Sequence, residues 1–139
     1  MDSQSFERII MKNLPLGIQT FTDMIDGNYI YVDKTRDILQ LISSGRYYFL
    51  SRPRRFGKSL LISTLKEIFS GNQALFHGLY IYDKIEWTPH PVIHLDFSSL
   101  DYATPEELQQ SLVGGLGQIA SDYELSVQPG GLKKYFHHI

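Results

Sequence analysis

The sequence predicts an α/β fold in which a parallel β-sheet is flanked by helices. Short apolar runs that are typical of buried strands alternate along the chain with segments that have the apolar spacing of amphipathic helices. The clearest of these runs is residues 47–50, a continuous apolar stretch of the kind expected for a strand covered on both faces. With 139 residues, of which 42% are hydrophobic, the chain is long enough to build a core.

Four short segments are predicted as strands of this sheet. Residues 29–32 are rich in β-branched and aromatic side chains, and residues 47–50 form the apolar run. Residues 91–97 supply a further strand, and residues 79–81 are a weaker candidate. The last eight residues begin another element, so we expect the sheet to be incomplete at the C-terminus.

Two amphipathic helices are expected in the first half of the chain. The first runs from about residue 34 to residue 43, with the side chain of Asp33 capping its first turn and Gly45 ending it. The second covers residues 58–69 and stops at Gly71. Both carry apolar residues at the spacing of a buried helical face.

A capping box predicts the start of a third helix. Thr104 is the expected N-cap, Pro105 occupies the first helical position, and Glu107 completes the box three residues after the cap. This helix extends to about residue 123, although the glycine pair at 114–115 weakens it.

The bulk composition excludes several classes of protein. A net charge of −2 gives no overall field that favours nucleic acid or a membrane surface, and the absence of cysteine excludes disulfides and thiolate metal sites. The N-terminus is polar, unlike a signal peptide, and no apolar run approaches the roughly 20 residues needed to span a bilayer. We therefore expect a soluble cytoplasmic protein with no membrane partner.

A ligand-binding site is expected at a tight loop, residues 51–57, that joins the apolar run at residues 47–50 to the second helix. Gly57-Lys58-Ser59 begins that helix, and the strand–loop–helix setting is the one a phosphate-binding P-loop requires. The first N–H groups of a helix lack internal partners and carry the positive end of its dipole, so they favour a phosphate. Lys58 adds a positive charge for the terminal phosphates, and the hydroxyl of Ser59 suits Mg²⁺.

One position departs from the usual Gly-x-x-x-x-Gly-Lys-Ser/Thr pattern. Arg52 stands where the first glycine would fall, and an arginine at positive φ carries a steric cost that glycine avoids. We therefore expect a loop of different shape, stiffened by Pro53 and made more basic by Arg54 and Arg55. The alternative is an ordinary connection whose basic turn is simply solvated.

Four separate motifs occur in order between about residues 11 and 110: Leu-Pro-Leu-Gly-Ile at 14–18, Tyr-Val-Asp-Lys-Thr at 31–35, Phe-Leu-Ser-Arg-Pro-Arg-Arg-Phe-Gly-Lys-Ser at 49–59, and Pro-Val-Ile-His-Leu-Asp-Phe-Ser at 91–98. Together they resemble the AAA-ATPase-like family, whose members are mostly bacterial and often carry a C-terminal nuclease-like domain of the PD-(D/E)XK type. The resemblance implies a P-loop NTPase-like fold, ATP and Mg²⁺ as cofactors, and a loop that is the Walker A element. It also implies that the Arg-Pro-Arg-Arg stretch is a family variant of this loop.

The resemblance implies that residues 1–139 are the N-terminal part of one such domain, with residues 1–13 as a lead-in. Family members have a later strand that ends in an acidic pair, the Walker B element, which positions Mg²⁺ and water. No such strand follows in this sequence. We therefore expect ATP hydrolysis in a longer protein, and slow or no hydrolysis by these 139 residues alone.

The expected site residues follow from the loop. Lys58 is the expected catalytic residue and Ser59 the expected Mg²⁺ ligand. Nucleotide contacts are expected from seven consecutive residues: Arg54, Arg55, Phe56, Gly57, Lys58, Ser59 and Leu60. Asp96, near the end of the predicted strand at 91–97, is a second candidate for Mg²⁺. The resemblance places that strand before Walker B, which favours an indirect or capping role for Asp96.

Two other functions are compatible with the same loop. A regulatory or interaction module would bind phosphate there without turning it over. Alternatively, Arg52, Arg54, Arg55 and Lys58 would contact the phosphates of a nucleic acid, although the net charge of −2 does not support this. In a homo-oligomer, Arg54 or Arg55 would reach a neighbouring subunit.

Overall fold

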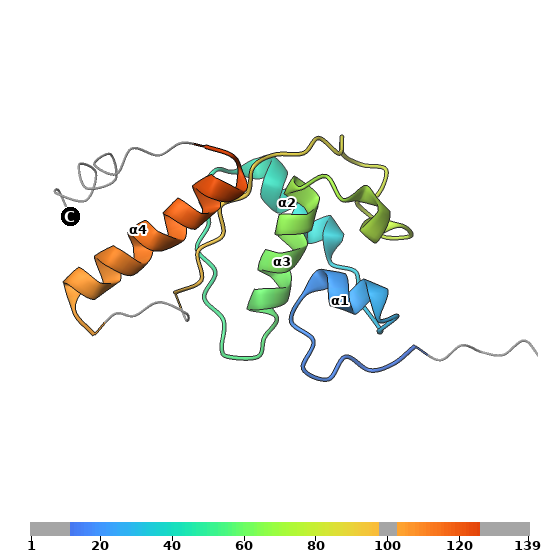
Figure 1. Cartoon of the computed structure of the whole chain (residues 1–139). Helices are drawn as coiled ribbons and strands as arrows, with labels where there is room; N and C mark the ends of the chain where they lie inside the picture. The colour runs from blue at the N-terminus through green and yellow to red at the C-terminus, as the bar shows by residue number, and fades with distance from the viewer. Residues whose placement is uncertain (1–11, 98–102, 126–139) are drawn as a thin grey trace, which may run out of the picture. The chain divides into compact units, whose positions relative to one another are not determined.

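The computed structural model describes residues 12–97 and 103–125 (Figure 1). Most of the expected lead-in and the expected C-terminal element lie outside these residues. The chain divides into two compact units, Met1–His90 and Pro91–Ile139. The helices, in chain order, are α1 (Phe21–Asp26), α2 (Thr35–Ser44), α3 (Lys58–Phe69), the short 3₁₀ helix η1 (Gln73–Phe76) and α4 (Pro105–Asp122).

The predicted parallel sheet is wrong, because residues 12–97 and 103–125 contain no strand. The β-type pairing found in this part of the chain is an isolated parallel bridge between Asn13 and Tyr29. Residues 47–50 run extended without a partner, and residues 79–81 lie in turns. β-Propensity describes how a side chain fits a pleated surface, and it does not supply the neighbouring strand on which such a surface depends.

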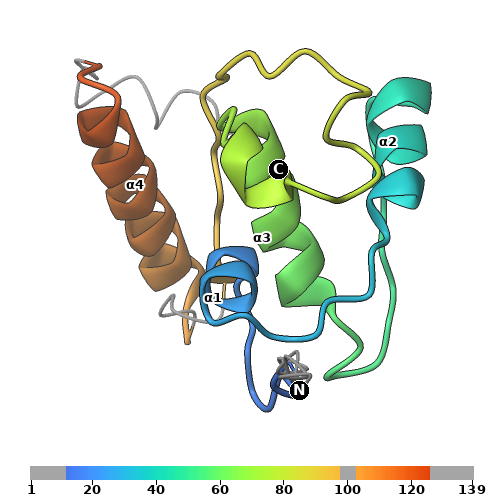
Figure 2. The same ribbon diagram turned by 90° about the vertical axis from the view of Figure 1, so that its right-hand side faces the viewer.

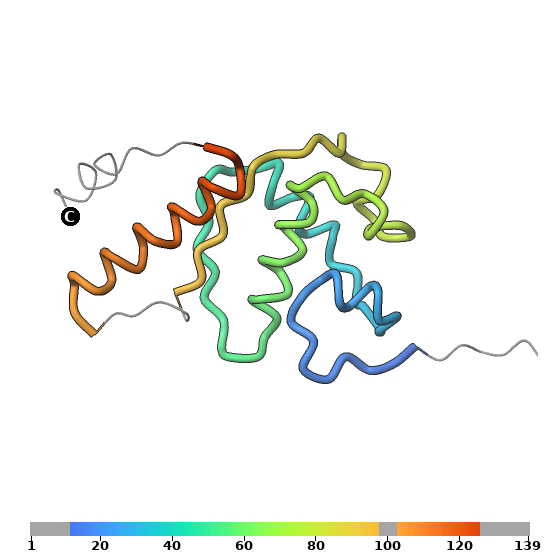
Figure 3. The backbone as a smooth tube through the Cα atoms, in the orientation of Figure 1, coloured from blue at the N-terminus to red at the C-terminus, as the bar shows by residue number. Residues whose placement is uncertain are grey.

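The apolar run at residues 47–50 was predicted to be a buried strand, and this prediction is wrong. The side chains of Tyr47 and Phe49 are 95% and 94% exposed, where burial on both faces was expected. Tyr48 attaches the run to α2, since its hydroxyl donates a hydrogen bond to the carbonyl oxygen of Leu41. Figure 3 follows this extended segment from the end of α2 down to the turn that enters α3.

The predicted helices are confirmed, with small shifts at their ends. α2 begins one residue later than expected, and α3 has the predicted bounds. In α4 both hydrogen bonds of the capping box between Thr104 and Glu107 are present, and the helix continues through the glycine pair at 114–115. Sequence analysis missed α1, a helix of six residues that begins after the N-cap Thr20. Among the described residues, no helix combines the length and apolar character needed to cross a membrane.

The core of the first unit joins its three α-helices to the segment after α3. Figure 2 shows α3 flanked by α1 and α2. The buried cluster takes one or two side chains from each part: Phe21, Ile38, Ile68, Phe76 and Ile81. Phe21 stacks on Phe76 with ring centroids 4.6 Å apart, and its backbone N–H donates to the hydroxyl of Ser63 on α3 at 2.8 Å. These contacts hold α1 against the middle of α3 and against the segment that follows it.

The start of α2 is fixed by the carboxylate of Asp33. One oxygen accepts hydrogen bonds from the backbone N–H and the hydroxyl of Thr35, at 2.8 and 2.7 Å. The other oxygen accepts a hydrogen bond from the backbone N–H of Tyr80 at 2.7 Å. The buried hydroxyl of Thr35 accepts a hydrogen bond from the backbone N–H of Ile81 at 3.1 Å. The N-cap position is Lys34, one residue later than predicted, and its side chain makes no capping hydrogen bond. Asp33, just before it, takes this role by accepting from the first N–H of the helix, and it also ties the helix to Tyr80.

Candidate functional site

The N-terminus of α3 is open at its cap. Gly57 is the N-cap residue in a left-handed conformation, with φ of 73°, and the helix begins at Lys58. A Cβ atom built on Gly57 would meet nothing within 4 Å. Glycine is therefore favoured here by backbone conformation, because a side chain would have room but would be strained at this φ. Gly57 offers no side chain to the N–H groups of the first turn, which leaves them to a ligand.

The left-handed residues of the loop before α3 lie at positions that the sequence did not indicate. A different loop shape was expected because Arg52 replaces the first glycine of the usual pattern, and Arg52 is not among the residues with positive φ. The non-glycine residue held in the left-handed region is Arg55, with φ of 65°. Left-handed backbone at Arg55 and again at Gly57 turns the chain sharply around Phe56, directly before the helix.

The side chain of Lys58 is hydrogen-bonded to the backbone at the start of the loop. Its ammonium group donates hydrogen bonds to the carbonyl oxygens of Arg52, at 2.5 Å, and Pro53, at 2.9 Å. The first residue of α3 is thereby tied to the beginning of the loop that precedes it. Two neutral carbonyl oxygens hold the ammonium group beside the loop. A phosphate oxygen can replace them with a stronger contact, because it carries a charge opposite to that of the ammonium group.

A cavity of about 670 Å³ lies against this loop. Six of the residues expected to contact a nucleotide line it together: Arg54, Arg55, Gly57, Lys58, Ser59 and Leu60. Its volume is within the range of small-molecule binding sites. Three of these six residues are cationic, and no carboxylate is found among the described residues that line the cavity. The cavity therefore favours an anion.

Part of the lining of this cavity comes from the segment before α1. Pro15, Gly17, Ile18 and Gln19 line it, and reasoning from residue chemistry did not single out any of them as site residues. The available signal was the motif at 14–18, which carries no charge or nucleophile. Its contribution depends on a tertiary contact with a loop about forty residues later in the chain.

The remaining expected residues are placed elsewhere. Phe56 lines a neighbouring cavity of about 410 Å³ together with Arg52. Asp96 lies in the second unit, and no group of three or more His, Asp or Glu side chains that could hold a metal occurs among the described residues. Ser59, in the first turn of α3, lines the cavity at the loop with a hydroxyl that suits Mg²⁺, an ion that commonly completes its shell with phosphate oxygens and water.

The carboxylate of Asp33 is occupied by its role as a cap. Burial raises the pKa of Asp33, but the hydrogen bonds from Thr35 and Tyr80 and the nearby charge of Arg36 outweigh burial and lower the pKa below its ordinary value. Both oxygens already accept hydrogen bonds from the protein. Asp33 therefore has a structural role at the start of α2 that accounts for both of its carboxylate oxygens.

Comparison with known proteins identifies the family. A family model described as "Predicted AAA-ATPase" matches residues 15–138. A protein of Azotobacter chroococcum mcd 1, named "Uncharacterized protein in vnfD 5'region", is 56% identical over 88 residues, which make up 62% of this chain and 17% of that protein. The chain thus covers only a small part of this relative's length. No solved structure is significantly similar to the chain. Because the family model covers nearly the whole sequence, from residue 15 to residue 138, the chain belongs to the AAA-ATPase-like family.

Proposed function

We propose that this chain binds Mg-ATP, with the phosphates in the cavity between the loop at residues 51–57 and the segment before α1. The observation that carries the proposal is the convergence of Arg54, Arg55 and Lys58 on one cavity at the open N-terminus of α3. Membership of a family described as predicted ATPases supports it.

Each part of the loop would have a separate task. The N–H groups of the first turn of α3 would donate to phosphate oxygens, aided by the helix dipole. Lys58 would exchange the carbonyl oxygens of Arg52 and Pro53 for the terminal phosphates. Ser59 would supply a hydroxyl ligand to Mg²⁺, with the rest of the coordination shell coming from phosphate and water.

We assign ATP hydrolysis to the longer protein of which this chain would be the N-terminal part. Phosphoryl transfer needs one group that holds Mg²⁺ in register and another that orients water, and Ser59 alone cannot do both. Asp96 remains a candidate for an indirect role. A C-terminal nuclease-like domain and a homo-oligomer, with Arg54 or Arg55 reaching the neighbour, are proposals about that longer protein.

The distribution of basic side chains argues against nucleic acid as the main ligand. Arg54, Arg55 and Lys58 line the cavity at the loop, whereas Arg52 lines the neighbouring cavity. A nucleic-acid backbone requires a stripe of positive charge along its path. These four charges instead line two separate cavities. A compact polyphosphate suits the arrangement better, whether it is hydrolysed or held as a regulatory ligand.

Amide hydrogen exchange with and without Mg-ATP tests this site directly. We expect the nucleotide to slow exchange across residues 54–60, because their N–H groups would donate to phosphate. Exchange within α4 should not change, which provides an internal control. Nucleotide that binds without slowing exchange at residues 54–60, or that does not bind at all, would contradict the proposal.

A further inference from the structure

A second cavity, of about 410 Å³, adjoins the cavity at the loop. Pro15, Gly57 and Leu60 line both cavities, so the two hollows meet at the N-terminus of α3. Gly57 presents no side chain at this junction, and the space where a Cβ atom would lie is open. A ligand whose phosphates lie on the loop side can therefore extend past Gly57 into the second cavity.

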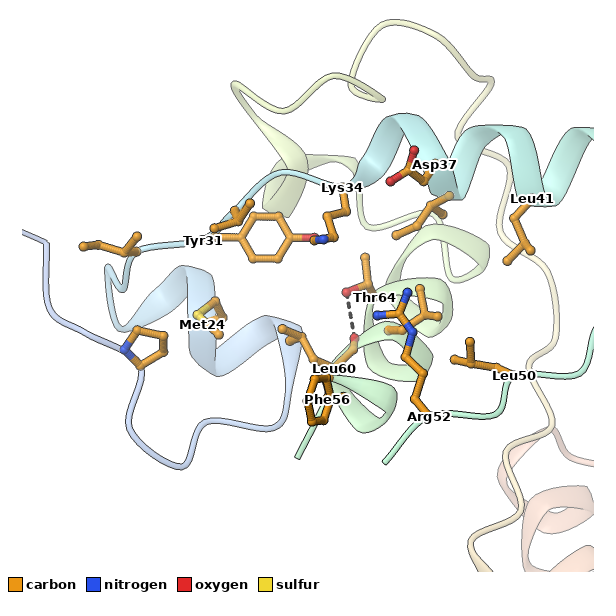
Figure 4. A pocket seen from close by; sticks show the side chains of 16 residues that line it. Met24, Tyr31, Lys34, Asp37, Leu41, Leu50, Arg52, Phe56, Leu60 and Thr64 are labelled. Atoms are coloured by element: carbon orange, nitrogen blue, oxygen red, sulfur yellow. Dashed lines mark hydrogen bonds between the residues drawn. The ribbon is translucent and has the colours of Figure 1, made fainter. Parts of the chain in front are cut away.

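The walls of the second cavity suit a flat, largely apolar ring. Figure 4 shows Tyr31, Lys34 and Asp37 on one side, and Leu60, Phe56 and Arg52 on the other. Aromatic rings and an arginine guanidinium are surfaces on which a nucleobase stacks. Burial raises the pKa of the Tyr31 hydroxyl above its ordinary value, so this ring remains a neutral phenol.

The polar groups of the cavity add selectivity to this apolar surface. Asp37 lies in the first turn of α2, and its carboxylate oxygens can accept hydrogen bonds. Because Asp37 is exposed, water satisfies it in the free protein, and a ring that carries an N–H₂ group can replace that water as the donor whereas a ring without a donor cannot. Ionised lysine and arginine are donors only, so Lys34 and Arg52 complement ring nitrogens that accept.

From these contacts we propose that the second cavity binds the base of the nucleotide and selects a purine that carries an exocyclic amino group. The proposal rests on the proposed function, because it assumes that the phosphates occupy the cavity at the loop. Tyr31, Phe56 and Arg52 provide the stacking surface, and Asp37 accepts from the amino group.

The first test separates the base from the phosphates. Mg-ATP and magnesium tripolyphosphate are titrated into the whole chain by calorimetry, and ATP should bind roughly tenfold more tightly, as stacking of one base would provide. Leu41→Trp, which fills the second cavity, should remove this advantage and leave tripolyphosphate binding unchanged. Ile62→Trp is the matched control, since Ile62 is 42% exposed on α3 and lines neither cavity.

The outcomes distinguish this inference from the proposed function. If tripolyphosphate does not bind, the phosphate site itself is refuted. If it binds and ATP binds no more tightly, or if Leu41→Trp retains the ATP advantage while folding normally, the phosphate site stands and the base pocket is refuted.

The second test addresses the amino group. Purine riboside triphosphate differs from ATP only in having hydrogen in place of the exocyclic amino group. Wild type should therefore bind it several-fold more weakly than ATP, less than for a buried hydrogen bond to a charged acceptor because Asp37 is exposed to water. Asp37→Ala should reduce this difference to none, whereas Gln40→Ala, on the same helix but outside the cavity, should preserve it. Equal binding of the two nucleotides by wild type, or an unchanged preference in Asp37→Ala, would overturn the assignment of Asp37.

Discussion

The ammonium group of Lys58 donates a hydrogen bond of 2.5 Å to the carbonyl oxygen of Arg52, across the loop that separates the two residues. This contact places a positive charge beside the cavity before any ligand arrives, because Lys58 also lines that cavity. The charge is held by neutral acceptors, so an incoming phosphate has only to replace carbonyl oxygens.

Removal of this charge should weaken Mg-ATP binding. We expect Lys58→Ala to cost roughly 1.5–3 kcal/mol, or about tenfold to 150-fold in the dissociation constant, as for a lost hydrogen bond to a charged group. Calorimetric titration of wild type and variant measures this. Lys66→Ala, in the last turn of the same helix, should bind as wild type does. Equal affinity in Lys58→Ala and wild type would remove Lys58 from the site.

The hydroxyl of Ser59 should matter only when Mg²⁺ is present. We expect Mg²⁺ to strengthen ATP binding by wild type and by Ser59→Thr, which keeps a hydroxyl ligand, and to have little effect on binding by Ser59→Ala. Titrations of ATP with Mg²⁺ and with a chelator check this in all three proteins. A Ser59→Ala variant with the full response to Mg²⁺ would show that the ion is held by other groups.

The cap at Asp33 should make stability depend on pH on the acid side. Its pKa is lowered in the folded protein from an ordinary value of 3.8, because its hydrogen bonds and the charge of Arg36 outweigh the opposing effect of burial. A lowered pKa means that the stabilisation is fully present above 3.8 and is lost as the pH falls through the folded value.

Asp33→Ala should therefore lower the free energy of unfolding by roughly 1 kcal/mol at neutral pH, as for a lost helix cap. The difference from wild type should shrink as the pH falls below 3.8. Denaturant melts across this range measure both effects. Asp26→Ala removes another exposed carboxylate, at the end of α1, and serves as the control. A difference that stays constant down to low pH would mean that the carboxylate charge of Asp33 does not contribute.

The helices could be predicted because their signals are local. The capping box at Thr104 and Glu107 and the carboxylate at Asp33 each act within three residues, and the structure shows the hydrogen bonds that each implies. The sheet could not be predicted in this way. The run at residues 47–50 has the composition of a buried strand, but pairing depends on distant segments, and no segment of the described chain pairs with it.

The candidate site was predictable in part for the same reason. Residues 54–60 are contiguous, so a turn followed by a helix brings most of them to one cavity. The wall at residues 15–19 depends on long-range packing between α1 and α3, which no local pattern encodes. The conformation of Arg55, and the turning of Phe56 and Arg52 toward the second cavity, likewise depend on the folded loop.

The exposed run at residues 47–50 should cause the isolated chain to associate. Tyr47 and Phe49 are almost fully exposed on an extended segment without a paired strand, and such a segment is a template for pairing with another chain. Light scattering should therefore show an apparent mass that rises with protein concentration. Tyr47→Lys with Phe49→Lys should abolish this rise without lowering the melting temperature, because neither side chain contributes buried surface.

A matched double variant separates this run from general surface hydrophobicity. Leu14 and Leu16 are 70% and 88% exposed, so Leu14→Lys with Leu16→Lys adds the same charge and also removes two exposed apolar side chains. We expect this variant to associate as wild type does, because its substitutions leave the extended run intact. A wild-type chain that stays monomeric at every concentration, or equal suppression of association by both double variants, would show that residues 47–50 do not direct association.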